Sequence, residues 1–259
     1  MIESKEIIRV TKLKVSLIRT GKVILDNINF SCNQSEILTI LGKNGEGKTT
    51  LALSLTKLLD RRVYLIKGEV FVRNKNIFEF DENNLQQLRR DKIGYILQNP
   101  FAAFNPVYKI KDQFEELCKL KNLSFENVIY LMKQLNLEHF DQILNKYPFE
   151  LSGGMLQRLS AIRVIAYKPE IIIADEPTSA LDRPISNQLI NLLRDYVKGE
   201  NGVLIFITQD ISIAESISDK IAFLSNGKLS DPAEIDKIFE HSNNIELNLF
   251  LNSYLQLKI

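Results

Sequence analysis

Residues 42–49 carry the clearest chemical pattern in the chain. They read Gly-Lys-Asn-Gly-Glu-Gly-Lys-Thr, which has the spacing of a phosphate-binding loop. Glycines let the backbone curl until successive N–H groups point at phosphate oxygens, Lys48 can reach the outer phosphates, and the Thr49 hydroxyl can ligand Mg²⁺. The residues expected to bind phosphate are Gly42, Asn44, Gly45, Glu46, Gly47, Lys48, Thr49 and Thr50.

Glu46 is the unusual member of this loop. A carboxylate repels phosphate, so only the backbone N–H of this residue suits the pattern. We therefore expect the Glu46 side chain to point away from the bound anion.

A second group of polar residues follows the apolar run 171–174. Asp175 and Glu176 come directly after it, and ligands bind α/β sheets at the carboxyl ends of their strands. There Asp175 can hold Mg²⁺, and Glu176 can accept a proton from a water molecule that attacks a phosphate. Alone, Asp-Glu-Pro is more typical of a helix cap. Together with residues 42–49 it indicates a site for phosphoryl transfer.

A third element is Leu151–Arg158, which opens an expected helix about twenty residues before the Asp-Glu pair. Ser152, Gly153 and Gly154 offer a hydroxyl and free N–H groups to an anion. A serine N-cap followed by glycines would produce the same local geometry for structural reasons alone.

The elements that must position these residues alternate between strands and helices. Continuous apolar strands separated by helices indicate an α/β fold with a mostly parallel core sheet. The expected strands are 7–18, 23–30, 36–41, 93–97, 171–174, 203–208 and 220–224. The expected helices follow residue 49, with Leu51, Leu55, Leu58 and Leu59 on one face, and lie at about 155–167, 184–198 and 210–218.

Between Pro106 and Glu150 no strand-like run appears and helical spacing dominates. We interpret residues 99–154 as a helical subdomain inserted into one α/β domain, whose core is formed by residues 1–98 and 155–230. The alternative is that these are further surface helices of the same domain. Residues 231–259 are expected to form C-terminal helices, of which 245–257 is apolar on more than one face.

The composition narrows the function classes. The 259 residues are 45% hydrophobic, and 33 Lys plus Arg balance 32 Asp plus Glu, which argues against binding nucleic acid by bulk positive charge. Two cysteines and two histidines supply neither a disulfide framework nor a recognisable metal cluster. No stretch approaches the roughly 20 apolar residues that span a bilayer. We expect a cytoplasmic protein that reaches a membrane only through a partner.

Taken in order, these motifs resemble those of the ABC transporter ATPases over nearly the whole chain. They are the P-loop 42–49, a Q-loop at Gln98, the signature 151–158, the Walker B segment 171–176 and the D-loop 179–182. The resemblance implies an ABC cassette with an added N-terminal antiparallel β subdomain, and ATP and Mg²⁺ as cofactors. It implies Glu176, Gln98 and residue 209 as the catalytic positions, and Thr49, Gln98 and Asp175 as Mg²⁺ ligands.

In that family two cassettes meet head to tail, so one chain completes the ATP site of the other. The resemblance implies that Ser152, Gly153, Gly154 and Gln157, with Asp182 of the D-loop, serve the ATP bound by a second ABC ATPase subunit. Gln98 would sense the γ-phosphate, and the adjoining helical subdomain would pass the motion to a membrane permease. The apolar cluster Phe101–Phe104 either lines the groove for that permease or belongs to the subdomain core.

Two segments narrow the resemblance further. Gln98–Pro106, and Lys146–Glu150 before the signature, resemble the ATPases of oligopeptide, dipeptide and nickel importers. The resemblance implies as partners a second ATPase, either a paralogue or another copy of this chain, two transmembrane permease subunits and an extracytoplasmic solute-binding protein. The assembly would lie at the cytoplasmic face of the cell membrane, with no nucleic acid. The few residues after the core favour the nickel, metal-chelate or small-peptide branch.

Two departures from the family pattern stand out. Gln209 occupies the place of a histidine, and glutamine can bond a γ-phosphate but carries no charge. Leu17 occupies the place of the aromatic residue that stacks on adenine. Losing a transition-state contact of the first kind costs on the order of 10²-fold in rate. We therefore expect the site on this chain's own P-loop to hydrolyse slowly, while its signature serves the partner's site.

Two other readings remain open. The chain could be a structural subunit that clamps ATP while a partner hydrolyses, which Gln209 favours and Glu176 disfavours. It could also be a non-transport ABC protein acting on ribosomes or DNA, although such proteins usually carry tandem cassettes or long coiled coils, and no internal repeat appears here.

Overall fold

The computed structural model describes residues 5–234, which fall into two compact units. The first unit consists of the residues up to Gln87 together with those from Val203 onward, and the second is Leu88–Gly202. No helix in the described part of the chain is long and apolar enough to cross a membrane.

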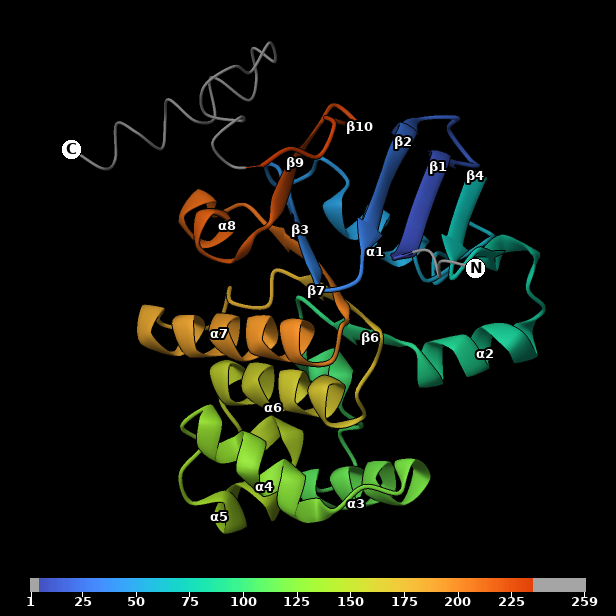
Figure 1. The fold of residues 1–259 in the computed structure, drawn as a ribbon. Coiled ribbons are helices and arrows are strands. Elements are labelled where there is room, and N and C mark those ends of the chain that lie inside the picture. The colour runs from blue at the N-terminus through green and yellow to red at the C-terminus, as the bar shows by residue number, and fades with distance from the viewer. Residues whose placement is uncertain (1–4, 235–259) are drawn as a thin grey trace. The chain divides into compact units, whose positions relative to one another are not determined.

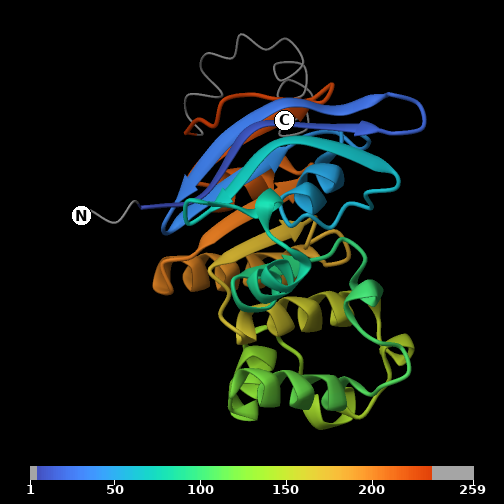
Figure 2. The ribbon, with the colours of Figure 1, turned by 90° about the vertical axis from the view of Figure 1, so that its right-hand side faces the viewer.

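The first unit contains an antiparallel sheet with the strand order β2-β1-β4-β5 (Figures 1 and 2). The bounds are β1 (Glu6–Leu17), β2 (Val23–Asn33), β4 (Tyr64–Val72) and β5 (Lys75–Asn76). This sheet agrees with the expected N-terminal β subdomain. β4 was not among the predicted strands, because only its second half alternates cleanly between buried and partly exposed residues.

The same unit contains a mostly parallel group of strands. β3 (Glu36–Leu41) runs parallel to both β8 (Val203–Thr208) and β9 (Lys220–Ser225), and β10 (Lys228–Leu229) pairs antiparallel with β9. Every residue of β3 and β8 is buried, as expected for parallel strands covered on both faces. The α/β class predicted from the apolar runs is therefore confirmed.

Among the described residues of this unit, α-helices are formed by α1 (Lys48–Ser54), α8 (Ile211–Ile217) and, reaching into the second unit, α2 (Glu82–Asp91). The predicted α1 was too long. The chain leaves the helix at Ser54, Lys57 adopts a φ of 54°, and the Leu58 N–H bonds back to Leu53 O. Leu58 is consequently 48% exposed instead of lying on the buried face. α2 was not predicted, because its face carries a single buried leucine.

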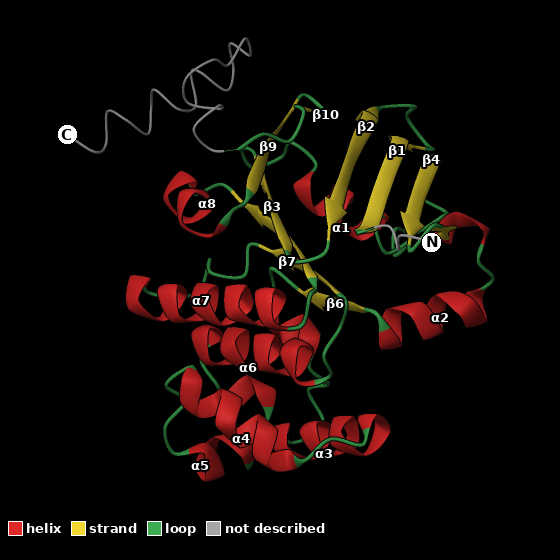
Figure 3. Ribbon diagram, in the orientation of Figure 1, coloured by secondary structure: helices red, strands yellow, loops and turns green. Residues whose placement is uncertain are grey.

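The second unit pairs β6 (Ile93–Ile96) parallel with β7 (Ile171–Asp175) and is otherwise helical (Figure 3). Its helices are α3 (Ile110–Lys121), α4 (Phe125–Gln134), α5 (Phe140–Leu144), α6 (Gly153–Ala166) and α7 (Arg183–Gly199), with short 3₁₀ turns at Pro100–Ala103 and Pro148–Glu150. No strand lies between residues 97 and 170, all of which the structure describes. The helical character expected for residues 99–154 is present, and their role as a separate inserted subdomain stays a prediction. The expected helix 245–257 lies outside the described residues.

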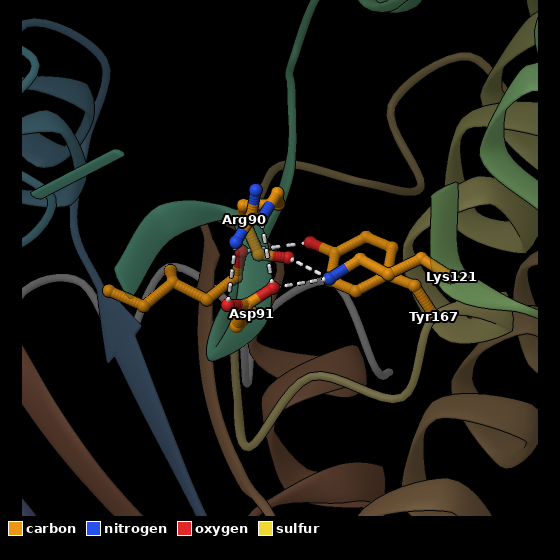
Figure 4. A network of polar contacts seen from close by, with 5 residues as sticks. Arg90, Asp91, Lys121 and Tyr167 are labelled. Atoms are coloured by element: carbon orange, nitrogen blue, oxygen red, sulfur yellow. Dashed lines mark hydrogen bonds and ion pairs between the residues drawn. The ribbon is translucent and has the colours of Figure 1, made fainter. Parts of the chain in front are cut away.

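A polar network fixes the end of α2 to the helical part of this unit (Figure 4). Lys121, at the end of α3, places its ammonium 2.8 Å from the Asp91 carboxylate and 2.6 Å from the Arg90 carbonyl oxygen. The same ammonium lies over the ring of Tyr167, whose hydroxyl donates to Ile93 O at 2.8 Å. The start of β6 is therefore held from two helices.

Candidate functional site

The phosphate-binding loop connects β3 to α1. Gly45 and Gly47 adopt φ values of 88° and 95°, which only glycine reaches without strain, and α1 begins at Gly47 with no side-chain cap. The Lys48 ammonium lies within the loop, donating at 3.0 Å to the carbonyl oxygens of Gly42 and Lys43. An uncapped helix start, a curled backbone and a buried lysine fit a nucleotide phosphate group.

The remaining loop residues differ in exposure. Asn44, Gly45 and Thr49 are exposed, while Thr50 is half-buried. The Glu46 carboxylate accepts a hydrogen bond from the backbone N–H of Asn226, so this side chain is directed to another part of the unit. That is the orientation the sequence requires of a carboxylate in an anion-binding loop.

Gln209 follows β8 at the same sheet edge as the loop. Leu41, the last residue of β3, is the register partner of Thr208, the last residue of β8, so Gly42 and Gln209 leave the sheet side by side. Gln209 is exposed. The next residue, Asp210, turns back to accept hydrogen bonds from the N–H groups of α8.

Leu17 ends β1 on the face that meets the phosphate loop. Its neighbour on that face, Val15, pairs with Leu25, and a Cβ added at Gly47 would lie 3.2 Å from the Leu25 side chain. Leu17 is half-buried, and its partner across the sheet is Tyr64. In the first unit the loop and Gln209 thus follow neighbouring strand ends, and Leu17 lies two residues from Val15 on β1. The roles assigned to Gln209 and Leu17 stay predictions.

In the second unit, β7 ends in the two predicted carboxylates. Asp175 is 2% exposed and accepts a hydrogen bond from the Tyr95 hydroxyl at 3.4 Å. Burial, reinforced by the Asp175 charge, raises the pKa of Tyr95 further above its ordinary value of 10.0. Glu176 is 8% exposed, adopts a φ of 46° and accepts a hydrogen bond from Gln98 Nε2 at 3.0 Å. Gln98 therefore holds the predicted base directly.

The signature segment starts α6. The Ser152 hydroxyl caps the helix by accepting from Met155 N at 3.2 Å, and Ser152 is exposed. A Cβ added at Gly154 would lie 3.0 Å from Ala180 O, so a glycine lets the D-loop approach the helix start. Gln157 is fully buried, and its amide donates to Leu97 O at 3.3 Å. This side chain connects the signature helix to the residue before Gln98.

The D-loop leads directly into α7. Asp182 caps that helix by accepting from Ile185 N at 3.1 Å. Arg158, one turn into α6, donates to Gly154 O and to Leu135 O on α4's C-terminal side, which ties the signature helix to α4. Burial lowers the pKa of Arg158 while the Asp182 charge opposes that shift.

The two ends of the Phe101–Phe104 cluster differ in burial, and its role in binding a permease stays a prediction. Phe101 is 46% exposed, whereas Phe104 is buried against Phe114 of α3. Arg163 of α6 lies over the Phe104 ring and donates to Ala103 O. The cluster is therefore core at Phe104 and surface at Phe101.

Two residues at the site escaped the sequence analysis. Tyr95 contacts Asp175 from a position 80 residues earlier, and Asn226 contacts Glu46 from 180 residues later. Asn226-Gly227 is a typical two-residue hairpin turn, and that signal was available in the sequence. The contacts themselves depend on strand register, which the sequence does not show.

Comparison with known proteins identifies the family to which the chain is similar. Residues 25–179 match the family model described as "ABC transporter". The oligopeptide transport ATP-binding protein OppD of Lactococcus lactis subsp. cremoris is 31% identical over 247 residues, covering 93% of this chain and 73% of that protein. The glutathione import ATP-binding protein GsiA of Escherichia coli is 29% identical, and the match covers 92% of this chain and 40% of that protein.

Solved structures agree. A dimeric ATP-binding cassette in a post-hydrolysis state, bound to ADP and Pi, matches with a TM-score of 0.77 and 26% identity over 88% of this chain and 98% of the other. An ATP-binding subunit of an ABC transporter matches with the same TM-score at 20% identity over 95% of this chain, which shows the shared fold.

Proposed function

The chain belongs to the ABC transporter ATPase family, and from that premise we propose that it is the energy-coupling subunit of an importer for short peptides. The observation that carries the proposal is the likeness over 93% of the chain to an oligopeptide transport ATP-binding protein, with the glutathione import relative as a second peptide-related match. Nickel or a metal chelate is the other substrate class to test.

The first unit supplies the binding half of the chemistry. Residues 42–49 would hold the triphosphate through backbone N–H groups at the start of α1, and Lys48 would neutralise the outer phosphates. Leu17 would give the adenine an apolar contact without stacking. Thr49 of this unit has an oxygen donor of the kind that Mg²⁺ prefers, and the family resemblance implies Gln98 and Asp175 of the second unit as further ligands. The bound ion would neutralise charge on the β- and γ-phosphates.

The second unit supplies the proton-accepting half. Glu176 would take the proton from the attacking water, and its bond to Gln98 fixes the carboxylate until that amide is drawn toward the nucleotide. Since Leu97 is bonded to Gln157 of the signature helix, a movement of Gln98 would be felt at α6. These two bonds support the proposal that Gln98 would pass a nucleotide signal to the signature helix.

The signature would act on a neighbour. Ser152 is exposed at an N-terminus whose following residues are glycines, a suitable donor set for a γ-phosphate that arrives from outside this chain. The proposed assembly therefore contains a second ABC ATPase, a paralogue in the two-type pairing of such importers, two permease subunits and an extracytoplasmic solute-binding protein. ATP would close the ATPase pair at the cytoplasmic face of the membrane and hydrolysis would release it.

A second candidate function is a nucleotide-binding structural subunit, in which ATP clamps the pair but this chain's site barely turns over. The exposed, uncharged Gln209 at the sheet edge beside the P-loop favours it. The buried Glu176 with its Gln98 contact favours a working site. We propose the intermediate case, a site that hydrolyses slowly.

The transport proposal is tested on the assembled complex in lipid vesicles. ATP hydrolysis by the complex should rise when the solute-binding protein is loaded with di- to pentapeptides. Lys48→Ala should remove the part of that hydrolysis that this subunit contributes. Stimulation by a nickel chelate alone would move the substrate to the metal class. Absence of MgATP binding by the wild-type chain would end the proposal.

The slow-site proposal is tested by single-turnover hydrolysis in the same complex. Glu176→Gln should depress overall turnover less than the matching change in the partner ATPase. An equal or larger effect would show that the two sites contribute alike.

A further inference from the structure

Glu46 is the one residue of the phosphate loop 42–49 whose charge has the same sign as a phosphate. Its side chain contacts Asn226, which lies 180 residues later in the sequence. Its Oε2 accepts a hydrogen bond of 2.5 Å from the backbone N–H of Asn226. Asn226 and Gly227 form the turn between β9 and β10, with φ values of 48° and 71°, and Ser225 pairs with Lys228 across it. Glu46 is half-buried in this arrangement.

The turn that donates this bond is itself fixed to the start of β2. The Gly227 carbonyl oxygen accepts from Asp26 N at 2.7 Å. A Cβ added at Gly227 would lie 2.5 Å from Ile24 O, so no other residue type fits there without displacing the β2 backbone. The turn is therefore held on β2 independently of Glu46.

The start of β2 in turn packs on the phosphate loop. A Cβ added at Gly47 would lie 3.1 Å from Ile24 Cγ2 and 3.2 Å from Leu25 Cδ2. The phosphate loop therefore contacts the start of β2, and β2 contacts the β9–β10 turn. The hydrogen bond from Asn226 N to Glu46 joins the turn between β9 and β10 directly to a side chain of residues 42–49.

We propose that Glu46 is a positioning residue for nucleotide binding, which clamps the phosphate loop to the β9–β10 turn in the curl that receives a triphosphate. The bond has two consequences: it orders the loop before the ligand arrives, and it turns a repulsive carboxylate toward an amide. The inference rests on the assignment of residues 42–49 as the ATP phosphate loop.

Substitutions can separate the clamp from the charge. Glu46→Gln keeps an oxygen that can accept from Asn226 N and removes the negative charge, whereas Glu46→Ala removes both. A hydrogen bond between neutral groups, at about 1 kcal/mol, corresponds to about a fivefold change in an equilibrium constant. We expect Glu46→Ala to bind MgATP about fivefold more weakly than Glu46→Gln, and Glu46→Gln to bind at least as tightly as wild type.

The measurement is calorimetric titration of the whole 259-residue chain with MgATP, with the melting temperature of each variant recorded without nucleotide. Glu69→Ala, which removes an exposed carboxylate from β4, is the matched control and should leave the affinity unchanged. If Glu46→Ala does not fold, Glu46→Asp serves instead, since it keeps the charge, falls one methylene short of Asn226 and should bind several-fold more weakly than Glu46→Gln.

The outcomes are distinct. Equal affinities of Glu46→Ala and Glu46→Gln for MgATP would overturn the clamp. If both variants bind more tightly than wild type, Glu46 acts only by charge repulsion. If both bind as wild type does and only the melting temperature falls, its role is only structural. A wild-type chain that binds no MgATP would instead overturn the assignment of the loop itself. If the wild-type chain binds MgATP and Lys48→Ala does not, the assignment of the loop stands. The difference in affinity between Glu46→Ala and Glu46→Gln then tests the clamp alone.

Discussion

The ends of β7 and β8 differ in how their polar residues are held. Both strands are buried throughout and both end in side chains expected to act on a phosphate. After β7, Asp175 and Glu176 are nearly enclosed and are bonded to Tyr95 and Gln98. After β8, Gln209 is exposed, and the neighbouring carboxylate, Asp210, is committed to capping α8.

The difference separates two kinds of contribution to one reaction. A base must keep its orientation while its charge changes, so low exposure and fixed partners serve it. A residue that only contacts the γ-phosphate needs reach, which an exposed glutamine has, but without a charge its stabilisation of the transition state is weak. Substitutions at the two strand ends should therefore differ in their effect on hydrolysis.

Glu176→Gln should lower single-turnover ATP hydrolysis at this chain's site by about 10²-fold or more, because glutamine keeps the shape but cannot accept a proton. MgATP binding should persist, measured by titration of the same variant.

A matched control lies at the opposite end of the strand. Glu170 directly precedes β7 and pairs with Lys92 at 3.6 Å, so Glu170→Gln removes a carboxylate next to the other end of the strand and should leave hydrolysis unchanged. If Glu176→Gln hydrolysed as fast as the control, the base would have to lie elsewhere.

Gln209→His should raise hydrolysis at this site by up to about tenfold, because a protonated imidazole adds a charged donor at the edge shared with the P-loop. The sign of the pH effect follows from the charge: with an ordinary histidine pKa of about 6.5 the gain is larger at pH 6 than at pH 8. The rates at both pH values check it. Gln86→His, an exposed change on α2, is the control and should show no gain.

The sequence predicted the parts of the site that depend on local spacing. The loop at 42–49, the strand before Asp175 and the serine that begins α6 each follow from adjacent residues, and the structure has each element where it was expected. The roles of the individual site residues stay predictions. Supporting contacts were not predictable, because Tyr95 and Asn226 reach their partners through the pairing of strands far apart in the chain.

The fold shows the same division. Fully buried strands such as β3 and β8 stood out as continuous apolar runs and were placed to the residue. β4 and α2 were not predicted, because β4 alternates over only half its length and α2 buries only Leu85. α1 was drawn too long, because a leucine repeat continues past the point where Lys57 turns the backbone out of the helix.

Gln157→Leu should lower the turnover number several-fold and raise the KM for ATP less than that. The substitution removes the bond to Leu97 O and so loosens the residue beside Gln98, whose amide donates to the base Glu176, while residues 42–49 are untouched. Stability should change little, because Gln157 Oε1 has no hydrogen-bond partner, and a leucine of similar volume replaces an amide that is only half satisfied. A fall in melting temperature with an unchanged turnover number would mean that Gln157 only supports the core.

Asp91→Asn should have the smallest effect of these substitutions, and the effect should be on the melting temperature. Asp91 belongs to the network that holds the start of β6, the strand that carries Tyr95, and so acts on the site only through that strand (Figure 4). Hydrogen bonds from Arg90 and Lys121 lower the pKa of Asp91 to about 2, from an ordinary value of 3.8. A carboxylate whose folded pKa is depressed stabilises the fold above about pH 4, and that contribution is lost as the pH falls toward 2. The variant should therefore melt a few degrees lower than wild type at pH 7, since a partly exposed pair contributes less than about 1 kcal/mol, and the gap should close in acid.

Asp60→Asn is the matched control: the pKa of Asp60 is also about 2, but its partner Arg62 is two residues away and can pair with it in the unfolded chain as well. If Asp60→Asn lowered the melting temperature as much as Asp91→Asn, the contact from Lys121 would add nothing to the support of β6, and the enclosure of the β7 carboxylates would have to come from the core alone.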